Sequence, residues 1–385
     1  AEEKGSLLRP GEPLRRLRNW LRSVSPGSKR AGGDPPPDDK QSPATCAVCH
    51  RIARGLTSLL ARLRRPLPRR SPAGRHDERD VQRTFQRHAY AGSRNRRYRI
   101  HLPAGFRPAA SYPLVMVLHG CRQTESDIRH ISGFDRVADE AGFVVVYPFI
   151  TSYAGLRNRN CWGWWFDNEI HRGAGEVEDL WQIVEEVCRD YAIDRRRIHV
   201  AGLSSGGGMA VAMMVSHAQR IAAGAVVAGV PFGESAGAVR MLRVMRAWFK
   251  PVGEIRRAML RAMGDERRPV PIFIVHSDGD ETVPLQAAIN IRESWRSCFG
   301  LPKGQPARKT DGTTRGTPWE HCVYTDTGHD PIIETLFLSG PGHGWYGGAA
   351  GAYSYPEAPD ISRLMWNFFR RHRLSQQTVQ RTTAA

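Results

Sequence analysis

A short apolar run that leads into a serine between glycines constrains this chain more than any other feature. Residues 198–201 read as a buried strand and enter Gly202-Leu-Ser-Ser-Gly206, after which small and apolar residues continue at helical spacing. Strand, sharp turn and helix are the context in which the G-x-S-x-G pattern exposes a reactive hydroxyl. The pattern therefore predicts Ser204 as a nucleophile. A Gly/Ser turn without chemistry is the alternative.

The end of a second strand carries the acid that such a serine requires. A nucleophilic serine needs a base, and the base needs a group that orients it. Residues 269–277 form an apolar run typical of a buried strand, and Asp278, Asp280 and Glu281 follow it. We expect Asp280 to orient the base. Asp278 and Glu281 compete with it, and turn capping after a strand is the other role open to these acids.

A glycine-rich loop after a third strand carries the expected base. Residues 332–338 read as a strand, and Gly340-Pro-Gly-His-Gly-Trp345 follows shortly after. Among the 14 histidines, His343 alone combines a position after the acid, a strand exit and a glycine-rich setting. The order serine, acid, histidine is the one expected after a strand–turn–helix serine. The chain therefore predicts a catalytic triad of Ser204, Asp280 and His343.

Two backbone N–H groups are expected to stabilise the negative charge that develops during acyl transfer. One belongs to Ser205, directly after the nucleophile. The other comes from the loop after the strand at residues 113–119, and Cys121 is the favoured donor. His119, at the exit of this strand, is expected to serve structure and to border the substrate rather than to transfer protons.

In sequence, these motifs resemble the catalytic domains of polyhydroxybutyrate depolymerase-like esterases, within the α/β-hydrolase superfamily. The resemblance runs from about residue 85 to residue 371 and implies the same triad. It implies an α/β fold with a mostly parallel, doubly wound sheet and helices on both faces. The motifs that carry it are Leu118-His-Gly-Cys121, Asn160-Cys-Trp-Gly-Trp-Trp-Phe166, Gly175-Glu-Val-Glu-Asp179, Gly202-Leu-Ser-Ser-Gly206, Asp280-Glu-Thr-Val-Pro284, Gly340-Pro-Gly-His-Gly-Trp345 and Asp360-Ile-Ser-Arg-Leu-Met-Trp-Asn-Phe-Phe369.

The resemblance implies a serine carboxylesterase that acts through an acyl-enzyme, most naturally on poly(3-hydroxybutyrate)-type polyesters or their oligomers. A feruloyl or acetyl esterase acting on plant polysaccharides is the alternative, because these enzymes share one catalytic constellation. A non-catalytic protein of a granule surface is the alternative outside enzymes. Ser205 and Gly344 stand where the family usually has Ala, which leaves substrate preference open. This chemistry requires neither a metal nor an organic cofactor.

Three tryptophans are candidates for the substrate-binding wall. Trp162 and Trp164 lie in the motif after Cys161, and Trp345 follows the histidine loop. Flat apolar rings suit an aliphatic or aromatic ester chain, and core packing is the alternative for each of them.

The first 80 residues differ from the rest in charge. They hold 18 Lys and Arg against nine Asp and Glu. This excess of nine positive charges is half of the net charge of +18 of the whole chain. Without a strand-like run, they are interpreted as a largely disordered basic Pro/Arg-rich arm. The catalytic domain then spans residues 81–373 and a polar tail spans 374–385. Within the domain, the basic, Met-rich residues 233–268 predict inserted helices that either cap the acyl pocket or pack away from it.

The arm suggests a surface rather than a nucleic acid as its partner. Residues 14–24 and 51–64 each place leucines on one helical face and arginines on the other. A basic amphipathic helix suits an anionic membrane or a lipid-coated granule. A tail that only keeps the protein soluble is the alternative. The arm matches no recognised nucleic-acid-binding fold, so no specific nucleic acid is expected.

The seven cysteines bear on the compartment. The resemblance implies cysteines at both Cys121 and Cys161, and Cys298 with Cys322 is a second candidate pair, although all can be free thiols. Two disulfides and a start at alanine slightly favour a secreted or extracytoplasmic location, with a cytoplasmic granule as the alternative. Cys46-Ala-Val-Cys-His50 matches a haem-attachment pattern, but neither a second ligand set nor a folded shell surrounds it. No apolar run approaches the ~18 residues of a membrane span.

Overall fold

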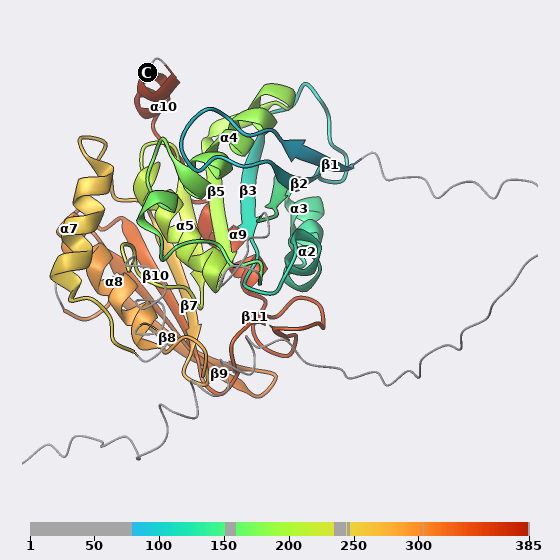
Figure 1. Ribbon diagram of the computed structural model, residues 1–385. Helices are drawn as coiled ribbons and strands as arrows, with labels where there is room; N and C mark the ends of the chain where they lie inside the picture. Colours follow the sequence, from blue (N-terminus) through green and yellow to red (C-terminus); the bar gives the residue numbers. More distant parts are fainter. Residues whose placement is uncertain (1–78, 151–158, 235–243, 245–246, 303, 384–385) are drawn as a thin grey trace, which may run out of the picture. The chain divides into compact units, whose positions relative to one another are not determined.

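The computed structural model describes residues 79–150, 159–234, 244, 247–302 and 304–383 (Figure 1). The strands that form the main sheet in these residues are β1 (Asp80–Phe85), β2 (Arg96–His101), β3 (Tyr112–Leu118), β4 (Val144–Pro148), β5 (Ile193–Leu203), β6 (Ala223–Val227), β7 (Ile272–Ser277), β8 (Arg308–Thr314), β9 (Thr317–Thr325) and β10 (Pro331–Leu338). Their order is β1-β2-β4-β3-β5-β6-β7-β10-β9-β8. Neighbours from β4 to β10 are parallel, whereas the pairs at both edges of the sheet are antiparallel.

Successive residues of the central strands face two separate helical layers. In β3, Leu114 and Met116 enter one apolar core, while Val115 and Val117 enter the other. This alternation follows from the two-residue period of a strand, and apolar residues at both positions bury both faces. One face is covered by α4 (Gly175–Asp190), α5 (Ser205–Ser216), α7 (Val252–Met263) and α8 (Gln286–Phe299), and the other by α2 (Glu125–Ser132), α3 (Phe134–Ala141) and α9 (Ile361–Phe369) (Figure 1). The predicted doubly wound, mostly parallel sheet is confirmed.

Two short helices, α2 and α3, follow β3 in the chain and are separated by one residue. Thr124 caps α2 through a reciprocal capping box with Asp127. Gly133, at φ 61°, ends α2 and begins α3. A left-handed residue cannot continue an α-helix, and glycine adopts that conformation without steric penalty. The glycine therefore separates the two short helices.

The Met-rich insertion contributes a helix to the layer on the sheet. Ile255, Met259 and Met263 of α7 are buried in the core shared with α5 and α8. The inward face of α7 therefore belongs to the helical layer that covers the sheet. Residues 235–243 and 245–246 lie outside the described residues. So do the predicted arm up to residue 78 and the Cys46–His50 motif.

The end of the chain forms a short polar helix. The polar tail predicted from residue 374 contains the helix α10 (Gln376–Thr383). It begins just after Leu374, which is buried and donates its N–H to the carbonyl oxygen of Arg196 at 2.9 Å. None of the helices in the described residues is both long and apolar enough to cross a membrane.

Candidate active site

The serine turn has the strained geometry that its sequence predicts. Ser204 lies between β5 and α5 at φ 58° and ψ −118°. Its N–H donates to the carbonyl of Val227 at 2.8 Å, and its carbonyl accepts from Gly208 at 3.0 Å. A Cβ on Gly202 would stand 2.2 Å from the carbonyl oxygen of Gly206, so only glycine fits where the strand and helix cross. A non-glycine residue at positive φ is strained, and such strain clusters at functional sites.

The predicted acid and base are in direct contact. Nδ1 of His343 lies 2.7 Å from Oδ2 of Asp280. Oδ1 of Asp280 accepts the backbone N–H groups of Thr282 and Val283, both at 2.8 Å. Because a carboxylate only accepts hydrogen bonds, we assign the ring proton of neutral His343 to Nδ1. Nε2 is then free to act as a base.

The surroundings of Asp280 favour its charged form. Burial of this carboxyl, 3% exposed, raises its pKa. The charge and hydrogen bond of His343, the nearby His276 and the N–H of Val283 act in the opposite direction and prevail, so the pKa lies below its usual value. His276 is itself buried, which lowers its pKa, and its Nε2 lies 2.9 Å from the carbonyl oxygen of Val283. The carboxylate therefore stays ionised at neutral pH.

Side chains after β7 hold the histidine loop in place. Ser277 Oγ donates to the carbonyl of Pro341 at 2.6 Å, and Asp278 Oδ1 accepts the N–H of Gly340 at 2.9 Å. Asp278 thus bridges two loops rather than capping its own turn, and Glu281 is exposed. Asp280 is the acid of this turn that the structure places in hydrogen-bond contact with the histidine.

The sheet brings the serine to the same edge as this pair. The strands β5, β6, β7 and β10 are consecutive parallel neighbours. The loops that follow them share one edge of the sheet, the usual place for ligands in α/β proteins. Ser204 follows β5, Asp280 follows β7 and His343 follows β10. In the described part of the chain, no hydrogen bond joins the side chain of Ser204 to that of His343.

The turn after β3 supplies the second candidate oxyanion donor. Ser205 is the first residue of α5, where backbone N–H groups have no partner within the helix. The described residues place no backbone acceptor on the N–H of Ser205 or on that of Cys121. Gly120 packs beside the nucleophile, since a Cβ built on it would stand 3.3 Å from Cβ of Ser204. Gly120, the residue before the predicted donor Cys121, therefore adjoins Ser204.

One of the two expected disulfides is present. Cys121 is bonded to Cys161, with their Cα atoms 4.3 Å apart, which ties the turn after β3 to the loop before α4. The pairing of Cys298 with Cys322 is wrong, because both are free thiols. Cys298 lies near the end of α8, and Cys322 lies in β9 with its Sγ directed at Glu320 of the same strand.

Most of the predicted substrate wall belongs to the core. Trp162 and Trp345 are fully buried, and their ring N–H groups donate to His119 O and Ser362 Oγ, at 3.0 and 3.1 Å. Neither ring presents a surface to a ligand, so both are withdrawn from the predicted wall. Trp164 is 6% exposed and packs in the apolar cluster that contains Cys161, so it stays a candidate.

Two roles were expected for His119, a structural one and a place beside the substrate. The structure supports the structural role and contradicts the other. It is fully buried, and burial lowers its pKa to about 4. Nδ1 lies 2.8 Å from the carbonyl oxygen of Gly120, and Nε2 accepts the N–H of Ile150 at 3.2 Å. The neutral ring therefore connects the turn after β3 to the end of β4.

Two buried acids of α4 support the site in a way that sequence reasoning did not specify. Glu176 Oε2 accepts the N–H of Gly163 at 2.7 Å, which fixes the loop that carries Cys161. Asp179 Oδ2 pairs with the guanidinium of Arg96 at 2.7 Å, and both side chains are fully buried. Three carboxylates stand in the first five residues of α4, and this concentration of acids was the signal for buried polar partners.

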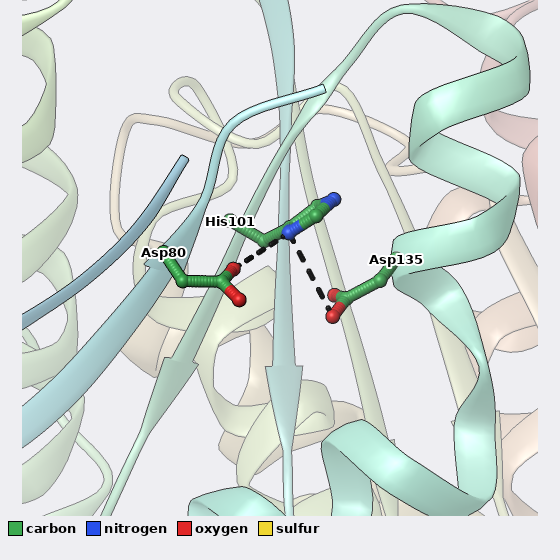
Figure 2. A group of neighbouring side chains, drawn as sticks. All are labelled: Asp80, His101 and Asp135. Carbon is green, nitrogen blue, oxygen red and sulfur yellow. Dashed lines mark hydrogen bonds and ion pairs between the residues drawn. The ribbon is translucent and has the colours of Figure 1, made fainter. Parts of the chain in front are cut away.

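One group of side chains has the composition of a metal site. Asp80, His101 and Asp135 are the one such group in the described residues whose candidate ligand atoms lie within 4.8 Å of one another (Figure 2). Arg129 already pairs with both carboxylates, through Nη2 to Asp80 and Nε to Asp135. Since a guanidinium neutralises this cluster, we assign it as an ion-pair network that links β1, β2 and the start of α3.

The family follows from comparison with known proteins. Residues 96–316, more than half of the chain, match the model of the family described as esterase PHB depolymerase. The chain belongs to this esterase family. Poly(3-hydroxyalkanoate) depolymerase C of Paucimonas lemoignei is 28% identical over 252 residues, which are 63% of this chain and 57% of that protein. The probable acetylxylan esterase A of Aspergillus fumigatus is 25% identical over 244 residues, 60% of this chain and 61% of that protein. The chain thus spans less than two thirds of either relative.

A solved structure supports the fold independently. The acetyl xylan esterase from Aspergillus awamori superposes with a TM-score of 0.58 at 20% identity. The match covers 68% of this chain and 94% of that one. With the strand order and helical layers described above, this establishes the α/β-hydrolase fold that the sequence predicted.

Proposed function

We propose that this member of the PHB depolymerase esterase family is a serine carboxylesterase with Ser204 as nucleophile, His343 as base and Asp280 as orienting acid. The observation that carries the proposal is the strained Ser204 at the sheet edge that also holds the contact between His343 and Asp280, 2.7 Å long. These groups match the parts that acyl transfer needs: a hydroxyl, an imidazole with a free nitrogen and a buried carboxylate.

The reaction proceeds in two halves. Nε2 of His343 takes the proton of Ser204 while Oγ attacks the ester carbonyl carbon, and the N–H groups of Ser205 and Cys121 stabilise the oxyanion. The tetrahedral intermediate expels the alcohol, which receives its proton from the imidazolium. Water, deprotonated by the same nitrogen, then attacks the acyl-enzyme and releases the acid and the free serine.

Replacing Ser204 by Ala tests the nucleophile. The variant removes one oxygen from a turn whose backbone hydrogen bonds remain, so the fold is expected to persist. Hydrolysis of p-nitrophenyl butyrate should fall by at least about 10⁴-fold in kcat. A folded Ser204→Ala variant that keeps wild-type turnover would place the nucleophile elsewhere. A wild-type protein without turnover would instead favour the alternative of a non-catalytic granule protein.

For the substrate, we favour poly(3-hydroxybutyrate)-type polyesters or their oligomers. The family match and the similarity to a protein named as a poly(3-hydroxyalkanoate) depolymerase support this choice. Acetyl or feruloyl esters of plant polysaccharides are the second candidate, because another relative is named as an acetylxylan esterase. Comparing initial rates of release of 3-hydroxybutyrate, acetate and ferulate from matched substrates decides between them. A higher kcat/KM on acetylated xylan would reject the polyester assignment.

We further propose that the basic N-terminal residues attach the enzyme to an anionic or granule surface, and that the enzyme works outside the cytoplasm. The excess of Lys and Arg in residues 1–80 supports the first statement, and the bond between Cys121 and Cys161 fits the second. Removing residues 1–78, which leaves β1 intact, should preserve soluble-ester kinetics but weaken sedimentation with phosphatidylglycerol vesicles. Equal sedimentation of both forms would refute the anchor.

A further inference from the structure

The turn after β3 is closed twice by the residue at its end. The backbone N–H of Gln123 donates to the carbonyl of Gly120 at 3.3 Å. In return, the side-chain Oε1 of Gln123 accepts the N–H of Gly120 at 2.8 Å. Arg122, the third residue of this turn, has φ 67°, the sign that a type II turn requires there. A turn closed in this way leaves the N–H of its second residue, Cys121, without a partner inside the turn.

Both peptide groups next to Gly120 are therefore held by side chains. The peptide before it donates to Gln123 Oε1. The peptide after it presents its carbonyl to Nδ1 of His119, 2.8 Å away, and to the N–H of Gln123. In a trans peptide the C=O and the following N–H point in opposite directions. Fixing the carbonyl of Gly120 thus also fixes the direction of the N–H of Cys121.

We propose that Gln123 is a positioning residue of ester hydrolysis: its amide oxygen holds Gly120 so that the N–H of Cys121 points at the oxyanion beside Ser204. The inference rests on the proposed function, because it assumes that Ser204 forms the tetrahedral intermediate. Gln123 acts through the backbone and does not itself touch the substrate. A misdirected donor loses transition-state stabilisation while ground-state binding of the ester is unaffected.

The other half of the amide indicates that Gln123 is not present for stability alone. Its side chain is 2% exposed, and Nε2 has no hydrogen-bond partner among the described residues. A buried donor without a partner is destabilising, and an apolar side chain of the same length would avoid it. Replacing Gln123 by Met leaves the N–H of Gly120 unpaired but removes the unpaired Nε2. The two effects oppose each other, so the melting temperature should change by less than about 3 °C.

The Gln123→Met variant tests the proposal with p-nitrophenyl butyrate. We expect kcat to fall by about 10- to 100-fold, with KM within about threefold of wild type. The affinity for a trifluoromethyl ketone, whose hemiketal oxyanion occupies the same hole, should fall in proportion to kcat/KM. The matched control is Gln182→Met on α4, where the lost amide bonds only to Glu178 of its own helix. This control should keep wild-type kinetics.

Each outcome separates the proposal from its alternatives. A purely structural Gln123 would give a lower melting temperature, with unchanged kcat and unchanged inhibitor affinity at a temperature where the variant is folded. If Gln123→Met does not fold, the Gln123→Asn variant tests the proposal instead. The asparagine amide is one methylene too short to reach the N–H of Gly120, so full activity of this variant would overturn the proposal. If Ser204→Ala is active, the proposed function fails. If Ser204→Ala is inactive and both Gln123 variants match wild type, only the role of Gln123 fails.

Discussion

Replacing Asp280 by Asn should disable the enzyme through the tautomer of His343 rather than through the fold. One carboxylate oxygen of Asp280 accepts two backbone N–H groups, at 2.8 Å each, and the other faces Nδ1 of the histidine at 2.7 Å. An asparagine has one oxygen and one NH₂ group. If this oxygen faces the N–H groups of Thr282 and Val283, it accepts two hydrogen bonds, whereas facing His343 it accepts one. The first orientation is therefore favoured, and it directs the NH₂ group at His343. Nδ1 must then accept a hydrogen bond, and the ring proton moves to Nε2, where the base is needed.

The magnitude follows from what is lost. A histidine held in the wrong tautomer of a Ser-His-Asp triad loses about 10⁴-fold in kcat, which corresponds to roughly 5 kcal/mol of transition-state stabilisation. The measurement is kcat on p-nitrophenyl butyrate, with circular dichroism melting to verify the fold.

Asp278→Asn is the matched control for this change. The same chemical change is made two residues earlier, at an exposed side chain whose remaining oxygen can still accept the N–H of Gly340. We expect kcat of the control within about threefold of wild type, because no ring nitrogen contacts Asp278. A folded Asp280→Asn enzyme that retains more than a tenth of wild-type kcat would refute the reasoning.

Three further predictions concern stability. Acid should destabilise the fold. Burial lowers the pKa of His119 to about 4 and the pKa of His199 to about 3. Between pH 6.5 and 4, these two histidines therefore bind protons in the unfolded chain but not in the folded chain. Stability is fully present above pH 6.5 and falls by roughly 1.4 kcal/mol per pH unit for each histidine below it; equal urea midpoints at pH 7 and pH 4.5 would contradict this. Replacing Cys121 and Cys161 together by Ser opens a loop of 40 residues and should lower the free energy of unfolding by ~4 kcal/mol in urea titrations, and an unchanged midpoint would exclude a stabilising role. Arg96→Met leaves Asp179 buried without its ion-pair partner and should lower the free energy of unfolding by about 3–5 kcal/mol. A loss under about 1 kcal/mol would show that the hydrogen bonds from Tyr90, Ser93 and Arg94 alone satisfy the carboxylate.

The central strands that precede the site were predictable because each contains a short apolar run close to turn residues, as β3, β5 and β7 do. The edge strands were not predictable in this way. β8 reads Arg-Lys-Thr-Asp-Gly-Thr-Thr, is largely exposed and pairs only with β9, so it lacks the apolar alternation that marks a strand. The strand β1 at the opposite edge is also mostly polar, with Val81 and Phe85 as its apolar residues. Polar edge strands protect a sheet from pairing with other chains, which is why composition conceals them.

The candidate site divides in a similar way. Ser204, Asp280 and His343 were predicted because each occupies a loop directly after a recognisable strand. The roles of Trp162 and Trp345 were predicted wrongly, since an aromatic ring near a motif in sequence can face either the pocket or the core. Gln123 was missed because its contribution depends on a reciprocal turn that only coordinates reveal. Chain order therefore located the contact between Asp280 and His343, but not the side chains that hold the loops around it.

Covalent labelling tests the identity of the nucleophile most directly. The full-length enzyme is treated with a fluorophosphonate until hydrolysis of p-nitrophenyl butyrate stops, and the modified peptide is mapped by tandem mass spectrometry. The proposed mechanism predicts one adduct, on Ser204, which requires His343 for its rapid formation and is absent from the Ser204→Ala variant. Complete inactivation with the adduct on another residue, or with Ser204 unmodified, would contradict it.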